Sequence, residues 1–526
     1  MFELGEDKKD YRCLTDRYVR KEVLQGQSYL VVEGEALELL AREAFADVSF
    51  FFRTHHLEGW RAILEDPQAS ENDKFVAAVL LRNAVISSEC LLPSCQDTGT
   101  ATVVAFKGHR VLTDGKDPKH LEEGIARTWR DLNLRYSQLA PLDMYKEINT
   151  GTNLPAQIDI YSKEGESYDF LFIAKGGGSA NKTLFFQATK AILEPGVLEN
   201  YLTEKIASLG TAGCPPYHLA VVIGGTSPEW NLKVVKLATA GYLDGLPGEG
   251  SREGRAFRDR ALEKRLLERS RSLPFGAQYG GRYFAMSVRV IRLPRHAASL
   301  PVGIGVSCSA DRNILGRITE RGVFLERLDK NPERFAADLE TFPEAVGVPL
   351  DTGKSMEEVR AVLGKHPVGT LVKITGPLIV ARDAAHARIR KLLHEGKPLP
   401  EYFKRYPIYY AGPAKTPQGM PSGSFGPTTS QRMDKYAVEF MEHGGSLVTL
   451  GKGNRGEELV QACKRWGGFY LGTIGGAAAL VAKEHVRSQE VVDFEDLGME
   501  AVRRLEVQGL PAFIVIDDKG NDLYKR

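Results

Sequence analysis

The spacing of apolar side chains near the N-terminus predicts two helices that face a core. Leu37, Leu40 and Ala44 recur every three or four positions within residues 35–46, which is the period of an amphipathic helix. A second helix is predicted over residues 70–87, because a serine followed three residues later by an aspartate forms a start signal. Both helices are expected to pack one face against the interior.

Other stretches are rich in β-branched and aromatic residues between polar turns, which is typical of strands. The predicted strands are residues 101–105, 156–161, 168–174, 218–223, 284–293, 370–375 and 446–450. Further helices are predicted over residues 119–133, 195–209 and 381–393, and another helix is predicted to begin at residue 228. Residues 511–524 are predicted to form a β-hairpin. The mixture predicts an α/β protein.

The chain is too long for a single hydrophobic core. It has 526 residues, which implies at least two domains. Residues 330–347 are polar and irregular, with two prolines, and are predicted to be a linker. The predicted domains are therefore residues 1–329 and residues 348–526.

The charge balance excludes a partner drawn by a global electrostatic field. The 69 Lys and Arg residues nearly cancel the 68 Asp and Glu residues, and the formal net charge is +1. Nucleic acid and membrane surfaces are therefore not expected as partners. No window approaches 18 consecutive apolar residues, and the first residues lack the core of a signal peptide. We expect a cytoplasmic protein.

Three of the six cysteines lie in similar loops of small residues. Cys95 lies in the loop 93–100 beside Gln96 and Asp97, and Cys214 and Cys308 lie in loops rich in glycine, proline or serine. Thiolates in such loops can hold an iron–sulfur cluster, because backbone N–H groups can reach the sulfurs. Three thiolates leave the fourth iron of a cubane open as a Lewis acid, which indicates a hydro-lyase. The alternative is three ordinary buried thiols, since their spacing matches no short motif.

Three further segments suit a negatively charged ligand. Residues 175–183 place three consecutive glycines after a strand, between two lysines, which favours an anion-binding turn. Residues 426–432 begin a helix with an exposed hydroxyl cluster and an arginine. Residues 451–456 fit the pattern GxGxxG, which raises a competing hypothesis of a nicotinamide-dependent oxidoreductase. Lys452 and Arg455 inside that turn suit a carboxylate better than a pyrophosphate.

Five strings together resemble the class I, iron–sulfur-dependent fumarate hydratases. The strings are residues 92–100, 149–157, 175–183, 381–386 and 451–456. The resemblance extends over nearly the whole chain, and the two predicted domains are similar to the alpha and beta subunits of two-subunit members. It implies reversible hydration of fumarate to (S)-malate on a [4Fe-4S] cluster, with a smaller C-terminal domain closing over the site.

The resemblance also implies a role for particular residues. The cluster ligands would be Cys95, Cys214 and Cys308, while the other three cysteines would be structural. The implied substrate contacts are Gln96, Arg135, Gly178, His296, Arg382 and Lys452. The implied catalytic residues are Thr428 as base, Arg432 as its activator and Asp97 as acid, with an exchange of roles between Thr428 and Asp97 left open. A homodimer is implied as well.

Two alternatives remain beside this hypothesis and the oxidoreductase. A related dehydratase acting on tartrate or mesaconate would need only small changes in the shape of the pocket. A non-catalytic iron–sulfur scaffold would keep the cysteine ligands without turnover.

Overall fold

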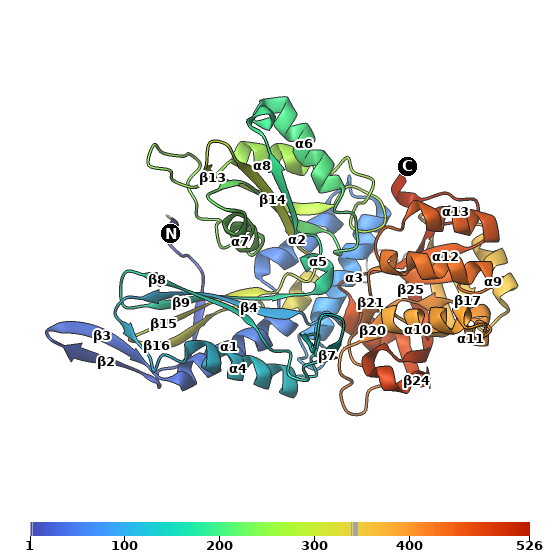
Figure 1. Cartoon of the computed structure of the whole chain (residues 1–526), viewed down its shortest axis with the longest axis horizontal. Coiled ribbons are helices and arrows are strands. Elements are labelled where there is room, and N and C mark those ends of the chain that lie inside the picture. The colour runs from blue at the N-terminus through green and yellow to red at the C-terminus, as the bar shows by residue number, and fades with distance from the viewer. Residues whose placement is uncertain (1, 3, 338, 340–345, 526) are drawn as a thin grey trace.

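The computed structural model describes all residues except 1, 3, 338, 340–345 and 526. It is an α/β protein in two parts, which lie side by side in Figure 1 with the C-terminal part in orange and red. The N-terminal part contains a six-stranded and a five-stranded sheet, and the C-terminal part contains a seven-stranded sheet. The predicted fold class is confirmed.

The six-stranded sheet forms the middle of the N-terminal part. Its strand order is β1 (Tyr11–Thr15), β16 (Gly322–Glu326), β15 (Asn313–Thr319), β9 (Tyr168–Lys175), β4 (Thr100–Gly108) and β8 (Gln157–Lys163). Strands β8 and β9 are joined by the polar turn that the sequence indicates, but they do not pair with each other. Strand β4 lies between them, parallel to β8 and antiparallel to β9.

The five-stranded sheet lies above the first in Figure 1. Its order is β10 (Leu184–Ala188), β14 (Leu300–Ser307), β11 (Tyr217–Gly225), β13 (Ala285–Arg295) and β12 (Phe257–Arg258). All described positions of β11 and β14 are buried, as expected for central strands with both faces covered.

Helices separate and cover these sheets. Apolar residues of α1 (Gly34–Phe50) and α4 (Asp117–Asp131) pack on one face of the six-stranded sheet, while α7 (Pro228–Thr239) packs on the other. The remaining helices of this part are α2 (Thr54–Glu65), α3 (Glu71–Ser87), α5 (Gly177–Ala180), α6 (Pro195–Ala207) and α8 (Arg260–Ser270). The helix start predicted at Ser70 is confirmed, because Ser70 and Asp73 form a complete capping box.

The seven-stranded sheet organises the C-terminal part. Its order is β17 (Val348–Asp351), β18 (Leu371–Val380), β19 (Ile408–Tyr409), β22 (Val448–Gly451), β23 (Phe469–Thr473), β25 (Val502–Ile516) and β24 (Val486–Asp493). Its helices are α9 (Met356–Leu363), α10 (Asp383–His394), α11 (Glu401–Arg405), α12 (Asp434–Glu442), α13 (Glu457–Trp466) and α14 (Ala478–Leu480).

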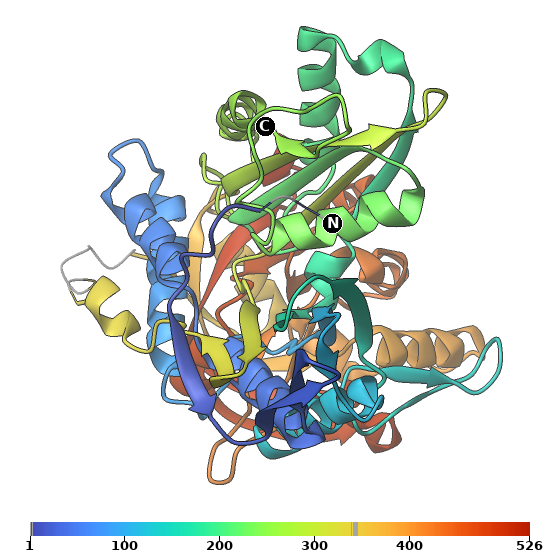
Figure 2. The same cartoon turned by 90° about the vertical axis from the view of Figure 1, so that its left-hand side faces the viewer.

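Three small sheets complete the described strands. They pair β2 (Val19–Leu24), β3 (Gln27–Val32) and β5 (Val111–Leu112), then β20 (Ala411–Pro413) with β21 (Phe425–Pro427), and β6 (Leu139–Pro141) with β7 (Glu147–Asn149). Figure 2 shows the β6–β7 hairpin as a teal arm that projects from the body of the molecule.

A continuous apolar core joins the two parts. One cluster of buried residues includes side chains of α2, α3 and the five-stranded sheet together with side chains of the seven-stranded sheet. Tyr279 stacks on Phe513 with ring centroids 4.4 Å apart, and its hydroxyl donates to the carbonyl of Thr473 at 2.5 Å. The C-terminal part is therefore firmly docked on the N-terminal part.

Two predictions about the second half need comment. The predicted C-terminal hairpin is wrong, because β25 ends at Ile516 and only an isolated bridge to Asp522 follows the turn. The predicted linker 330–347 lies partly outside the described residues, so the domain boundaries at 329 and 348 stay a prediction. In the described ranges, no helix combines the length and the hydropathy that crossing a bilayer requires.

His386 on α10 is buried inside the C-terminal part, as a packing residue. Its ring is 0% exposed, stacks on Phe440 and donates from Nδ1 to the carbonyl of Arg382 at 2.9 Å. Burial lowers the pKa of His386 to about 4, with Arg455 adding to the effect and Glu500 opposing it. The His386 ring is therefore neutral in the folded protein near neutral pH.

We expect His386→Phe to reduce the loss of stability on acidification. Because the folded pKa lies below the unfolded value of about 6.5, this contribution is complete above that pH and is lost as the pH falls towards 4. The effect is at most about 3 kcal/mol. Melting temperatures at pH 7.5 and pH 5 measure it, with the exposed His443→Phe as control. An equal acid shift in both variants would contradict the assignment.

Candidate active site

A cationic pocket of about 220 Å³ lies where the two parts meet. Its described lining comes from both parts and includes Gln96, Asp97, Thr100, Arg135, Ser137, Gly177, Gly178, Asn181, Arg382, Thr428, Thr429, Arg432 and Lys452. Three arginines and one lysine thus face a single carboxylate. Eight of the nine predicted substrate and catalytic residues are brought together here.

The loop that carries Cys95 and Gln96 is fixed from both sides. The N–H of the preceding Ser94 donates to the carbonyl of Ser49 at 2.9 Å. On the other side, the amide of Gln96 donates to the carbonyl of Pro427 at 2.9 Å. A Cβ on Gly426 would lie 2.4 Å from the Gln96 carboxamide oxygen, so only glycine permits this approach. The N-terminal loop is therefore shaped by the C-terminal part.

Asn153 joins this loop to the segment that carries Arg135. Its side chain is 0% exposed, donates to the carbonyl of Gly99 at 3.0 Å and accepts from the N–H of Ser137 at 2.7 Å. Thr98 adds a further link, because its hydroxyl oxygen accepts from the N–H of Arg135 at 3.0 Å. Arg135 is thereby held against the cysteine loop.

Asp97 is held among cations and backbone donors. The N–H of Gly177 donates to its carboxylate at 2.8 Å, and the Arg135 guanidinium lies 3.4 Å away. Burial would raise the pKa of Asp97, but Arg135 and Arg312 outweigh it and hold the pKa below its usual range. Asp97 is therefore an anion in the chain.

The C-terminal side of the pocket carries two arginines with acidic partners. Arg382 pairs with Glu500 at 2.7 Å, and Arg432 lies 3.3 Å from Asp383. Each acid pairs with only part of the arginine's guanidinium group, and the rest of that group faces the pocket. Planar Arg donors suit a carboxylate there.

Two buried hydroxyl side chains, those of Thr428 and Ser430, lie at the start of the 3₁₀ turn Ser430–Met433. Thr428 donates to the carbonyl of Tyr410 at 3.2 Å, and both hydroxyl residues are buried. The prediction of an exposed hydroxyl cluster is therefore wrong for Thr428 and Ser430, while Thr429 is half-buried and lines the pocket beside Thr428.

The three predicted ligand cysteines gather behind the pocket. The carbonyl of Cys214 accepts from the N–H of Ser309 at 3.0 Å, which ties its loop to the loop of Cys308. Burial raises the pKa of Cys214 to about 11; Lys452 opposes this, and the thiols of Cys308 and Cys95 add to it. The three thiols are therefore close enough to interact electrostatically.

Lys452 joins these sulfurs to the pocket. Its ammonium group donates to Cys214 Sγ at 2.8 Å while its side chain lines the pocket. Burial alone would lower the pKa of Lys452, but the thiols of Cys214, Cys95 and Cys308 raise it above its usual value. A cation at this place favours the thiolate form that metal binding requires.

The geometry suits a multi-metal cluster better than a single ion. Among the described residues, the three sulfurs do not form a group whose ligand atoms all lie within 4.8 Å of one another. A single tetrahedral ion holds its sulfurs at about 2.3 Å and needs them closer together. A Cβ on Gly475 would lie 2.2 Å from Cys214 Sγ, so this glycine lets the backbone of the C-terminal part pack closely against the sulfur.

The GxGxxG turn is occupied by contacts with the Cys214 loop. A Cβ on Gly453 would lie 2.6 Å from that of Ala212, and the Asn454 side chain accepts from the N–H of Thr211 at 2.9 Å. Arg455 is buried and pairs with Asp434 at 2.5 Å. Gly453 therefore serves domain docking, while Gly451 and Gly456 approach Ser430 and Asp434 of the same part, which removes the support for dinucleotide binding.

His296 is the one predicted substrate residue that the single chain does not bring to the pocket. It lies in the exposed turn between β13 and β14, whereas Cys308 follows the other end of β14. Eight strand residues separate these ends, which is roughly 25 Å at the usual rise. The substrate contact predicted for His296 has no support in the geometry of one chain.

Sequence reasoning missed several residues of the site. Arg312 is buried, faces Asp97 and Cys95, and follows the Cys308 loop directly, which is the signal that could have identified it. Asn153 lies within a string that was singled out, but its bridging role depends on the fold. Cys13 and Cys90 are exposed and Cys463 is buried in the core, away from the three gathered thiols.

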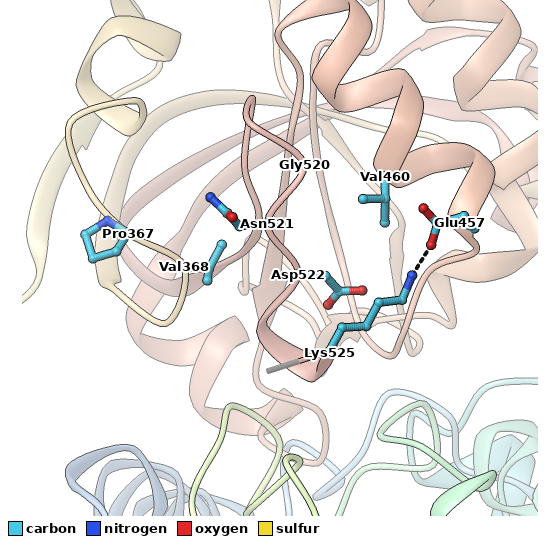
Figure 3. A pocket seen from close by; sticks show the side chains of 8 residues that line it. All are labelled: Pro367, Val368, Glu457, Val460, Gly520, Asn521, Asp522 and Lys525. Atoms are coloured by element: carbon cyan, nitrogen blue, oxygen red, sulfur yellow. Dashed lines mark hydrogen bonds and ion pairs between the residues drawn. The ribbon is translucent and has the colours of Figure 1, made fainter.

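A larger cavity of about 470 Å³ lies in the C-terminal part and is a weaker candidate. Figure 3 shows its lining, in which Lys525 and Glu457 pair across the opening beside Asp522 and Val460. Its described charged side chains are Glu457, Asp522 and Lys525, so the lining carries more negative than positive charge. The smaller cationic pocket is therefore the better site for an anionic substrate.

Comparison with family models connects both parts of the chain to one family. A model described as fumarate hydratase matches residues 38–317, and a model described as the fumarase C-terminus matches residues 322–526. Together they cover the cysteine loops and the C-terminal pocket residues.

Characterised relatives match along the whole length. The anaerobic class I fumarate hydratase of Escherichia coli (strain K12) is 54% identical over 526 residues, covering 100% of this chain and 96% of the relative. Fumarate hydratase 2 of Leishmania major is 54% identical over 513 residues, covering 97% of this chain and 90% of the relative.

We expect Asn153→Ala to loosen the segment that carries Arg135. The change removes two buried hydrogen bonds, worth about 2–3 kcal/mol together, at a positive φ of 62° that alanine tolerates less well. Melting temperature and limited proteolysis between residues 135 and 153 measure the effect. The control is Asn133→Ala, because Asn133 has a similar positive φ of 53° and its side chain makes no hydrogen bond within the described residues. Similar losses in both variants would argue against the bridging role.

Proposed function

This chain belongs to the class I fumarate hydratase family and is a hydro-lyase, and we propose that it catalyses the reversible hydration of fumarate to (S)-malate. The observation that carries this proposal is the meeting of four cations, one carboxylate and one buried hydroxyl in a pocket beside three gathered thiols. We also propose a cytoplasmic location, which the six unpaired cysteines support.

We propose that Cys95, Cys214 and Cys308 hold a [4Fe-4S] cluster. Their separation and the neighbouring Lys452 support this assignment. When bound, the cluster would supply an open iron that acts as a Lewis acid towards a substrate oxygen.

The pocket cations would bind the two carboxylates of the substrate. Fumarate carries two negative charges, and removing them from water requires compensating donors. Arg135 and Lys452 face the side near the cysteines, while Arg382 and Arg432 approach from the C-terminal part. Gln96, fixed by Pro427, would add a neutral donor or acceptor that orients the bound acid.

Asp97 and Thr428 would move the protons. Water adds across the double bond in the anti sense, so the two groups must approach from opposite faces. Asp97 comes from the N-terminal part and Thr428 from the C-terminal part, which supports this division. During hydration Asp97 would accept the proton that water loses, and Thr428, activated by Arg432, would supply the proton to C3. In the reverse direction Thr428 acts as base and Asp97 as acid.

A homodimer is the proposed assembly, and the β6–β7 hairpin is the proposed contact. Five large apolar side chains, Leu139, Leu142, Met144, Tyr145 and Ile148, are between 52% and 93% exposed on this arm. An isolated two-stranded hairpin is marginally stable in water, so such an arm gains from a partner surface. A second copy is favoured because most oligomers of soluble proteins are symmetric homo-oligomers.

We expect Cys308→Ser to prevent assembly of an intact cluster while Cys463→Ser leaves it unchanged. Cys308 belongs to the gathered thiols, whereas Cys463 is buried among core residues. Iron and sulfide analysis after anaerobic purification should give about four irons per chain in the wild type and in Cys463→Ser. Undiminished iron in variants of all three loop cysteines would overturn the ligand assignment.

The same preparation tests the reaction. Fumarate consumption, followed by ultraviolet absorbance, should be rapid in the wild type and absent in Thr428→Val, which should retain its iron. Mesaconate and tartrate serve as competing substrates. Cluster without fumarate turnover would move the substrate to these related acids, and absence of iron under strict anaerobic handling would refute the cluster mechanism.

We expect the double variant Met144→Ser/Tyr145→Ser to shift the assembly from dimer towards monomer. These side chains are 87% and 93% exposed and would be covered only by another chain. Light scattering after size exclusion measures the mass. Val23→Ser is the control, because Val23 is 72% exposed on the separate β2–β3 hairpin. A monomeric wild type, or a variant that stays dimeric, would refute the proposed contact.

A further inference from the structure

A second cavity with uncompensated positive charge lies behind the candidate active site. It has a volume of about 360 Å³ and lies between the six-stranded sheet and α7. Thr100 lines both this cavity and the catalytic pocket, so the two spaces adjoin. None of its described lining residues is acidic.

Alternate residues of the strands that surround the cavity point into it. Thr100 and Thr102 lie two residues apart on β4 and therefore point to the same face, where they pair with Lys175 and Ile173 of β9. Lys236 faces them from α7. Thr183 and the Gln157 amide add further polar groups to the lining.

The two lysines have only neutral hydrogen-bond partners in the described structure. Lys175 Nζ donates to Thr239 Oγ1 at 3.3 Å, and Lys236 Nζ donates to Gln157 Oε1 at 2.6 Å. Burial lowers the pKa of Lys175 to about 8, and Lys236 lowers it further, while Cys308 and Asp311 oppose the shift. Burial, with repulsion from Lys233, also lowers the pKa of Lys236.

The nearby carboxylates are already compensated. Asp159 pairs with Lys233, which precedes Lys236 by three residues on α7. Asp311 accepts hydrogen bonds from Ser307 and from Asn313. No carboxylate in the described residues lies within ion-pair distance of Lys175 or Lys236. Two partly buried cations on one cavity carry a desolvation cost that an anionic ligand would offset.

We propose that this cavity is a binding site for a small dianion, separate from the catalytic pocket. Its volume lies within the range of small-molecule sites, and its two ammonium groups and hydroxyls match a ligand with two negative charges. A dicarboxylate and inorganic phosphate share this chemistry. This site goes beyond the proposed reaction, because none of its described lining residues except Thr100 lines the catalytic pocket.

Succinate tests the proposal, because it is a dicarboxylate without a double bond or hydroxyl to react. Equilibrium dialysis with labelled succinate on the full anaerobic chain should show one site fewer in Lys236→Met than in the wild type, and Lys236→Arg should restore it. The control is Lys190→Met, because Lys190 is exposed and lies outside the described cavity lining. Lys175→Met should weaken the same site about tenfold or more.

Inorganic phosphate separates the two sources of ligand. Displacement of the Lys236-dependent succinate by phosphate indicates a general dianion site, and its retention indicates selectivity for dicarboxylates. Equal numbers of succinate sites in the wild type, Lys236→Met and Lys190→Met would overturn the proposal. This readout does not use turnover, so it stays interpretable if the chain does not hydrate fumarate.

Discussion

The contact between Lys452 and Cys214 is the constraint on which the rest of the site depends. It joins an ammonium group of the C-terminal part to a thiol of the N-terminal part at 2.8 Å, out of bulk water. Burial alone would lower the pKa of Lys452 and raise that of Cys214, so each group in isolation would resist ionisation. Lys452 opposes the rise in the pKa of Cys214, and the thiols raise the pKa of Lys452, so the two groups are electrostatically coupled. The same contact therefore contributes to both the domain interface and the site. The apolar stacking of Tyr279 on Phe513 stabilises the interface further.

Close backbone approach explains why three glycines of the C-terminal part face the cysteine loops. A Cβ would lie 2.2 Å from Cys214 Sγ at Gly475, 2.4 Å from the Gln96 side chain at Gly426, and 2.6 Å from Ala212 at Gly453. Real Cβ atoms do not tolerate such distances. Gly453 belongs to the pattern that resembles a dinucleotide fingerprint, and its contact with the N-terminal part accounts for one of the three glycines of that pattern. Gly451 and Gly456 instead approach Ser430 and Asp434 of the C-terminal part, so packing explains the pattern without a bound dinucleotide.

Much of the fold could be predicted from local signals, because α1 buries apolar residues at helical spacing, α3 begins at a capping box, and β4 is an apolar run that is buried along most of its length. The cysteine loops could be predicted from the shared chemistry of Cys95, Cys214 and Cys308. The insertion of β4 between β8 and β9, and the bridge made by Asn153, depend on long-range pairing that no local pattern encodes. The C-terminal hairpin failed because its turn signal is real, but the following residues form the 3₁₀ helix Leu523–Lys525.

The near-neutral total charge conceals a strongly cationic interior face. The whole chain has a net charge of +1, yet the described pocket lining places Arg135, Arg382, Arg432 and Lys452 around one aspartate. Charges separated by more than about 8 Å are largely screened at physiological salt, so a small anion senses this cluster only near the mouth of the pocket. Selection of a dianion therefore depends on local geometry. A compact dicarboxylate can meet several cations at once, whereas a larger polyanion would meet an almost balanced surface.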